Sequence, residues 1–102
     1  MHSEVIEHIT FRLKPGIGEA AFQAAAAPAY AICDSQPGFR WRRQLHRADG
    51  AMIDIIEWAD MAAAEAASAV IGNSPDCAAF LNTIDMASTV IEHLPVQARS
   101  KT

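Results

Sequence analysis

The stretch FRWRRQLHRADGAMIDIIEW, residues 39–58, decides the fold of this chain. Its two halves, residues 39–47 and 51–58, each alternate in side-chain character with period two, and they are joined through Asp49 and Gly50. An Asp-Gly pair tolerates the positive φ angles that tight hairpin turns require. The stretch therefore predicts an antiparallel hairpin, and its second strand, which is apolar on both faces, is expected to be covered on both sides.

Two further alternating segments predict the remaining strands. Residues 4–13 and 87–96 have the period of strands with two different faces. Pro95, near the end of the last segment, indicates the edge of a sheet, because proline cannot donate a hydrogen bond to a neighbouring strand. On the first strand one face carries large apolar side chains, and we expect that face to meet the helices: Val5, Ile9, Phe11 and Leu13.

Helices fill the intervals between these strands. Apolar residues at helical spacing predict one helix over residues 18–35 and another over residues 60–71, followed by a shorter one. Asp60 is suited to cap the second helix, because its side chain can accept a hydrogen bond from the first turn. Pro28 lies inside the first helix and removes a backbone hydrogen bond there, so we expect a kink or a break into two short helices.

The resulting β-α-β-β-α-β order predicts an α+β fold of the ferredoxin-like type, with one antiparallel sheet in the order 4-1-3-2 and helices on one face. The other face needs a cover, and 21 of the hydrophobic residues are alanines that bury little area. A second copy would supply this cover and complete a dimeric α/β barrel. We expect a single domain over residues 1–102, with an ordered core at about 4–96 and a polar tail at 97–102.

Composition excludes several classes of protein. A net charge of −4 and a pI near 5.4 do not fit a nucleic-acid partner. No apolar stretch approaches the ~20 residues of a membrane span, and the N-terminus lacks the pattern of a signal peptide. We therefore expect a cytoplasmic protein without a membrane or nucleic-acid partner. Cys33 and Cys77 lie far apart in helical segments, which is typical of buried core residues rather than metal ligands or a disulfide.

Four short segments carry a family resemblance: TFRLKPG at residues 10–16, QPGF at 36–39, EWAD at 57–60, and Ser74-Pro75 followed by Phe80. In this spacing the chain resembles the dimeric α/β-barrel superfamily, and within it the small antibiotic-biosynthesis-monooxygenase-like proteins. The resemblance covers residues 5–96. It implies a homodimer in which two sheets pack face to face, with a pocket near each sheet and its helices.

The resemblance also sets expectations about activity. The superfamily includes cofactor-independent oxygenases that act on polycyclic phenols and monooxygenases that degrade haem. Trp58 matches a tryptophan that lines the pocket in these relatives, whereas residues 61–80 lack the histidine that binds haem iron, so we expect no cofactor. The resemblance implies a small-molecule-binding protein, a cofactor-independent monooxygenase acting on an aromatic or polyketide-like compound. The alternative is a non-catalytic dimeric binding or stress-related module.

Polar side chains on the strands form the candidate site. A histidine beside a carboxylate can act as a general base, and an arginine can stabilise the anion that forms. We therefore expect His8, Asp54 and Arg42 to be catalytic, and Trp58, Thr10 and His93 to bind the ligand. The alternative is that His8 and Asp54 form a hydrogen-bonded polar pair at the dimer interface without turnover.

Two questions about the strand faces stay open at this point. If the apolar residues of the first strand face the helices, His8 faces the partner. The match at Trp58 favours the opposite assignment of the two sheet faces. A second charged group competes for the barrel interior: Glu7, Arg43, Glu57 and Glu92. The arginines of residues 40–47 are typical of a solvated edge strand, although one of them can turn inward. His8 and His93 alone are too weak a set for a metal, so we expect none.

Overall fold

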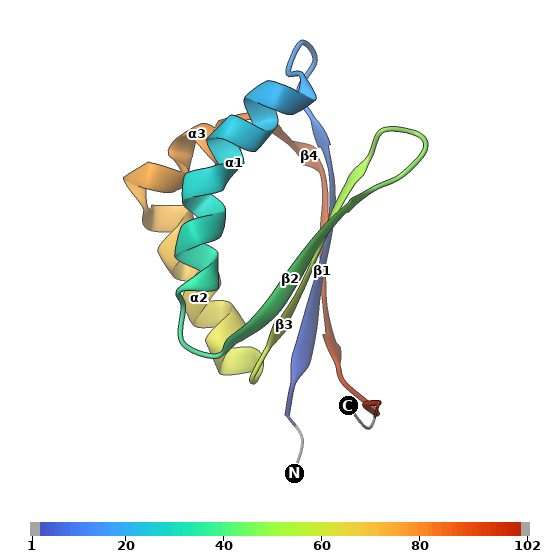
Figure 1. Ribbon diagram of the computed structural model, residues 1–102, viewed down its shortest axis with the longest axis vertical. Coiled ribbons are helices and arrows are strands. Elements are labelled where there is room, and N and C mark those ends of the chain that lie inside the picture. The colour runs from blue at the N-terminus through green and yellow to red at the C-terminus, as the bar shows by residue number, and fades with distance from the viewer. Residues whose placement is uncertain (1–2, 101–102) are drawn as a thin grey trace.

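The computed structural model describes residues 3–100 and shows a four-stranded antiparallel sheet with helices on one face (Figure 1). Along the chain the elements are β1 (Val5–Leu13), α1 (Glu19–Asp34), β2 (Phe39–His46), β3 (Met52–Trp58), α2 (Met61–Asn73), a short 3-10 helix (Pro75–Cys77), α3 (Ala78–Asn82) and β4 (Ile84–Pro95). The sheet order β2-β3-β1-β4 confirms the predicted arrangement. Residues 101 and 102 of the predicted tail lie outside the described residues.

The register of the strands decides which side chains share a face. In the antiparallel pair of β1 and β3, Val5 lies opposite Trp58 and Ile9 lies opposite Asp54. Directly opposed residues of antiparallel strands point to the same face of the sheet. The odd-numbered residues of β1 and the even-numbered residues of β3 therefore both face the helices. The prediction for the apolar face of β1 is confirmed, because Val5 and Phe11 are buried.

Two groups of buried side chains hold the helices on the sheet. In the first, the ring of Phe22 on α1 lies between Phe11 and Phe80, with its centroid 5.9 Å from each of theirs. In the second, Trp58 meets Phe39 edge to face at 5.8 Å and packs against the buried alanines of α2. Alanine has no long side chain, so α2 approaches β3 closely. Both groups lie between the sheet and the helices, and they fix the distance between the two layers.

Helix α1 runs as one element from Glu19 to Asp34, with Pro28 inside it. The predicted break into two short helices is therefore wrong. Phe22 before the proline and Cys33 after it are both buried against the sheet. Their burial holds both halves of α1 against the sheet as one continuous helix, and it offsets the single backbone hydrogen bond that proline cannot make.

The ends of the other elements follow from local contacts. The side chain of Asp60 accepts a hydrogen bond of 2.8 Å from the backbone N–H of Ala63, which confirms it as the cap of α2. Strand β4 begins at Ile84 rather than at residue 87, because a register shift between Thr10 and Arg12 lets it continue along β1 through an irregularity. Within residues 3–100, no helix is long and apolar enough to cross a membrane.

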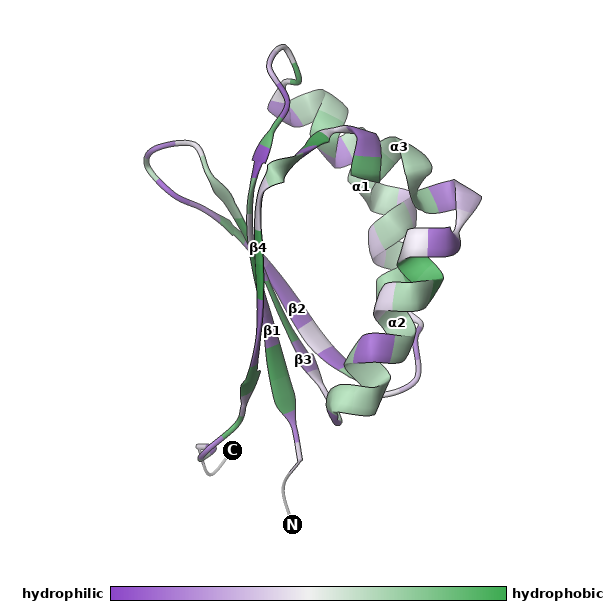
Figure 2. Cartoon of the chain, turned by 180° about the vertical axis from the view of Figure 1, so that it is seen from behind, coloured by the Kyte–Doolittle hydropathy of each residue, from purple (hydrophilic) through white to green (hydrophobic). Residues whose placement is uncertain are grey.

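The second face of the sheet carries no helix, and it is called the open face below (Figures 1 and 2). Figure 2 shows the helices mostly in the pale green of alanine, so the large apolar side chains lie mainly on the strands. On the open face Leu45, Val90 and Leu94 are 46%, 58% and 45% exposed. Apolar side chains left this exposed on both edge strands of one face are typical of a surface that meets a partner.

Gly38 allows the loop after α1 to pass close to α2, and its replacement is expected to destabilise the fold. Its φ angle is +84°, and a Cβ atom there would lie 2.5 Å from the Cβ of Ala63. Both carbons are fixed to backbone, so only a shift of the loop or of α2 relieves the contact. We expect Gly38→Ala to lower the free energy of unfolding, measured in urea, by about 2 kcal/mol more than a matched control.

Gly16→Ala is that control. Gly16 has nearly the same φ angle, +85°, but a Cβ atom there would meet nothing within 4 Å. Its replacement measures the backbone cost of a left-handed residue alone, about 1 kcal/mol. Equal losses in the two variants would contradict the close contact between the loop and α2.

Candidate active site

A cavity of about 300 Å³ lies between the helices and the sheet. Three side chains that carry a carboxylate or a phenol reach its wall: Glu7 from β1, Tyr30 from α1 and Asp54 from β3. The other lining residues are apolar or small: Ile9, Phe11, Ala29, Cys33, Ser68, Ile71, Gly72, Phe80, Leu81, Ile84, Met86, Thr89 and Ile91. Cavities of this size, apolar with a few polar groups, are typical of small-molecule sites.

The mouth of the cavity lies beside β4. Met86 and Ile91 both line the cavity, yet they are 61% and 51% exposed. A side chain that lines a cavity and is more than half exposed marks where the cavity meets solvent. The three polar side chains, in contrast, lie at its inner wall, where Glu7 and Asp54 are buried.

Tyr30 and Asp54 form the most closely connected polar pair of the cavity. The Tyr30 hydroxyl lies 2.8 Å from Oδ2 and 3.1 Å from Oδ1 of Asp54. Gln44 Nε2 donates to the Tyr30 oxygen at 2.8 Å, and Gln23 Nε2 donates to Gln44 Oε1 at 2.7 Å. Because each group donates to the next, the Tyr30 proton is directed at the carboxylate. The chain of hydrogen bonds therefore fixes the position of Asp54 and ends on it.

Burial makes Asp54 unusually basic for a carboxylate. The pKa of Asp54 is raised to about 6, chiefly by loss of solvent on burial. The hydrogen bond from Tyr30 and the charge of Arg42 act to lower this pKa, whereas the charge of Glu7 acts to raise it. Burial, and then the neighbouring Asp54, also raise the pKa of Tyr30 far above its usual value. Tyr30 thus stays a neutral donor, while Asp54 exchanges its proton near neutral pH, as a general base must.

Glu7 occupies the same wall and connects two of the predicted ligand-binding residues. Trp58 Nε1 donates a hydrogen bond of 3.0 Å to Glu7 Oε1, and His93 Nε2 lies 3.5 Å from Glu7 Oε2. Both contacts follow from register, because Glu7 lies opposite His93 on β4, and Trp58 lies two residues along β3 from the partner of Glu7. Trp58 and His93 thus lie behind the carboxylate of Glu7.

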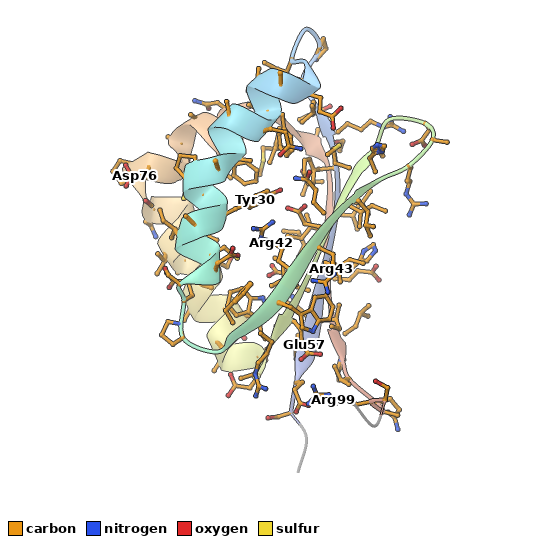
Figure 3. The ribbon with its side chains drawn as sticks, viewed as in Figure 1. Tyr30, Arg42, Arg43, Glu57, Asp76 and Arg99 are labelled. Atoms are coloured by element: carbon orange, nitrogen blue, oxygen red, sulfur yellow. The ribbon has the colours of Figure 1, made fainter. Side chains whose placement is uncertain are left out.

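Arg42 faces the helices, but its charge is already engaged. Its guanidinium makes two hydrogen bonds of 3.1 Å with the carboxylate of Asp34 at the end of α1. The same group lies over the ring of Tyr30, with Cζ 3.8 Å from the ring centroid. Figure 3 shows Arg42 and Tyr30 side by side between α1 and β2. Arg42 therefore positions Tyr30 through stacking and does not enter the cavity wall.

The six predicted site residues do not converge on one site. Arg42, Asp54, Trp58 and His93 face the helices, whereas His8 and Thr10 lie on the open face. The predicted pairing of His8 with Asp54 is wrong, because Ile9 lies opposite Asp54 and His8 lies opposite Ile55. A residue and its neighbour along a strand point to opposite faces, so the sheet separates the two side chains.

The competing charged group is also divided by the sheet. Glu7 lines the cavity, while Arg43, Glu57 and Glu92 share the open face, where His8 Nδ1 lies 3.9 Å from Glu92 Oε1. At one end of this face Arg99 lies 3.9 Å from Glu57, a contact that can be followed in Figure 3. Since His8 and His93 lie on opposite faces, they cannot share a metal ion.

Three residues of the site were not assigned to it by the sequence. Tyr30 is the only tyrosine of the chain and lies four residues after Ala26 on the buried stripe of α1. This helical spacing was the one sequence feature that could have placed Tyr30 at the site. For Gln44 the sequence indicated only which face of β2 it shares with the other even-numbered residues. Cys33 lines the wall as a thiol, because burial, followed by the charge of Asp34, raises its pKa to about 12.

The sheet order, the one-sided helical layer and the cavity between the layers define the fold of the antibiotic-biosynthesis-monooxygenase-like proteins, as the sequence resemblance predicted. One of the similar solved structures is SnoaB, a cofactor-independent oxygenase from Streptomyces nogalater. It is 27% identical over 97% of this chain and 96% of that chain, with a TM-score of 0.69. A SnoaB mutant is 22% identical over 98% and 99% of the two chains, with a TM-score of 0.78.

A more distant structure has the same fold. A proposed antibiotic-biosynthesis monooxygenase from Caulobacter crescentus is 19% identical over 93% of this chain and 91% of that chain, with a TM-score of 0.71. No protein-family model matches the chain, and no curated protein matches it in sequence. The similarity to these structures therefore establishes the fold.

Proposed function

We propose that the protein is a cofactor-independent oxygenase that acts on an aromatic or polyketide-like compound bound in the cavity. The observation that carries this proposal is Asp54, a buried carboxylate with a pKa of about 6 at the wall of an apolar cavity. The similarity in fold to SnoaB, described as a cofactor-independent oxygenase, supports the same reading. Of the predicted residues, Asp54 keeps a catalytic role, while Arg42 positions Tyr30.

The first step is removal of a proton from the substrate. A methylene or phenol next to a carbonyl or aromatic ring is acidic enough to lose its proton to a carboxylate of raised pKa. Asp54 accepts this proton, and the electron pair of the broken C–H or O–H bond delocalises over the rings. The apolar wall excludes water, which keeps the carboxylate basic and the carbanion from being protonated again by solvent.

The second step uses molecular oxygen as the only oxidant. The electron-rich anion transfers an electron to O₂, and the two radicals combine to form a C–O bond and a peroxide. The peroxide takes a proton from Asp54. The carboxylate of Asp54 then removes the remaining proton on carbon as the O–O bond breaks, and the departing hydroxide takes up that proton to form water. The products are a ketone or quinone carbonyl and one water. One O₂ and one CH₂ group thus give one C=O and one H₂O, with no cofactor needed for balance.

The alternative of a non-catalytic module predicts a pocket filled by side chains. The cavity of about 300 Å³ counts against it. An engineered cavity of about 150 Å³ suffices for benzene, so this one has room for about two or three fused rings. We retain the oxygenase as the proposed function.

The proposal includes a homodimer formed through the open face. Leu45 and Val90, from the two edge strands, and Leu94 leave apolar surface exposed across this face. A second copy related by a two-fold axis would cover it with the same residues, because such an interface is self-complementary. In this dimer His8 and Thr10 belong to the interface rather than to the cavity.

The oxygenase is tested with 1,3-dihydroxynaphthalene, whose keto form has a methylene next to both a carbonyl and an aromatic ring. We expect the protein to consume O₂ and form a hydroxynaphthoquinone in a one-to-one ratio, faster than the uncatalysed oxidation. Ala29→Phe fills the cavity and is expected to reduce the rate by at least about 10-fold, because Ala29 lines it. An unchanged rate of O₂ uptake on adding protein would contradict the proposal.

The matched control for this variant is Ala31→Phe. Ala31 lies on the same helix but is exposed to solvent. The same side chain added there leaves the cavity free, so we expect turnover at the wild-type rate. A loss in both variants would assign the effect to α1 rather than to the cavity.

A further inference from the structure

We propose that the cavity selects uncharged aromatic ligands that donate hydrogen bonds at two points, and that it rejects aromatic carboxylates. This inference is based on two buried carboxylates, those of Glu7 and Asp54, which lie together on one apolar wall of the cavity. The inference rests on the proposed function, because it names the class of compound that the same cavity accepts.

The two carboxylates lie close together on the sheet. Glu7 lies opposite Ile56 and Asp54 lies opposite Ile9, so the two are diagonal neighbours on adjacent strands and share the face that meets the helices. They are 7% and 3% exposed. The charge of Glu7 is itself one of the influences that raise the pKa of Asp54. An ionised carboxylate only accepts hydrogen bonds, so the wall offers two acceptor sites to a ligand.

No positive charge in the wall balances these acids. Among residues 3–100, no lysine, arginine or histidine lines the cavity. Arg42 lies nearby, but both of its hydrogen-bonded nitrogens point to Asp34, and the ring of Tyr30 lies against its guanidinium. His93 lies behind Glu7, with Nε2 3.5 Å from Oε2, so any charge it carries is directed at Glu7. A bound anion would therefore find no partner.

The remaining wall reinforces the selection. Tyr30 already donates its proton to Asp54, and most of the other lining residues are apolar, among them Phe11, Ile71 and Phe80. An anionic ligand would lose its water and meet two negative charges at short range, where repulsion is poorly screened. A hydroxyl at each end of a ring system would instead donate to Glu7 and to Asp54. Built-in repulsion of this kind is a strong source of specificity.

Two ligands with one scaffold test the inference: 2,6-dihydroxynaphthalene and 6-hydroxy-2-naphthoate, which differ only in a hydroxyl or a carboxylate at one end. Binding to the full chain is measured by calorimetry under nitrogen, at about pH 8, where the naphthoate is ionised. We expect the dihydroxy compound to bind at least about 100-fold more tightly. Equal affinities would overturn the inference and leave the proposed function standing, whereas failure of both ligands to bind would overturn both.

Variants identify the source of the selection. Glu7→Gln and Asp54→Asn each remove one charge and add an amide donor, so we expect each to reduce the preference at least about 10-fold by admitting the naphthoate. Asp76→Asn removes a carboxylate that is exposed at the outer side of the helical layer (Figure 3), and it should leave the preference unchanged. A preference retained in the Glu7→Gln/Asp54→Asn double variant would overturn the inference.

Discussion

Asp54→Asn is expected to lose about 10²–10⁴-fold in turnover and yet to unfold at a higher temperature than the wild type at about pH 8. The loss of turnover follows because an amide cannot accept the substrate proton. The gain in stability follows because the variant no longer buries a charge, while its oxygen still accepts the hydrogen bond from Tyr30. Oxygen uptake and thermal melting of the same preparations measure the two effects.

The pH dependence of this gain has a definite sign. Burial raises the pKa of Asp54 from 3.8 to about 6, so the folded chain binds this proton more tightly than the unfolded chain. The stability that this proton contributes is fully present below about pH 4 and is lost as the pH rises through about 6. We expect Asp54→Asn to gain about 2 kcal/mol over the wild type at about pH 8 and nearly nothing at about pH 4.

Asp76→Asn serves as the control in both measurements, since Asp76 is exposed and lies outside the cavity. It should leave turnover and the melting temperature unchanged at either pH. Full activity in Asp54→Asn would remove Asp54 from the chemistry, and an equal change in stability at both pH values would show that its carboxyl is not perturbed by the fold.

Val90→Lys is expected to convert the proposed dimer into a monomer of 11.0 kDa. Val90 is 58% exposed on the open face, and its strand β4 is an edge of the sheet. In a two-fold interface each substitution enters twice, so two lysines would be buried without partners. We expect the dissociation constant, measured by sedimentation equilibrium, to rise at least about 100-fold.

Val70→Lys is the matched control for the dimer. Val70 is 42% exposed, but it lies on α2, on the other side of the sheet from the open face. The same charge there should leave the dimer intact. A wild-type chain that sediments as a monomer at micromolar concentration would contradict the proposed interface outright.

The fold could be predicted from the sequence because its signals are local. The turn at Asp49 and Gly50 and the cap at Asp60 are decided by residues adjacent in sequence, and the apolar face of β1 is read from one strand alone. Pro28 is the exception. Its local effect is outweighed by buried contacts on both sides, which only the tertiary structure reveals.

The site was predicted less well, because it depends on how strands far apart in sequence are paired. An even-numbered residue of β3 lies opposite an odd-numbered residue of β1. On β4, odd-numbered residues lie opposite odd-numbered ones up to Thr10, and this relation reverses at the register shift before Arg12. Neither relation can be read from the alternation within a single strand. His8 was therefore grouped with Asp54, and Glu7 was assigned to the opposite group. Tyr30 was missed because a tyrosine on a buried stripe is indistinguishable in sequence from a core residue.

The thiol of Cys33 at the cavity wall is in a form that resists oxidation by the proposed reaction. A reaction that passes through superoxide and peroxide exposes nearby sulfur to oxidation, and the reactive form of cysteine is the thiolate. With its pKa raised to about 12 by burial, Cys33 stays protonated at neutral pH. The sulfur at the cavity wall is thus held in its least reactive state, which would protect the proposed oxygenase from inactivation by its own intermediates.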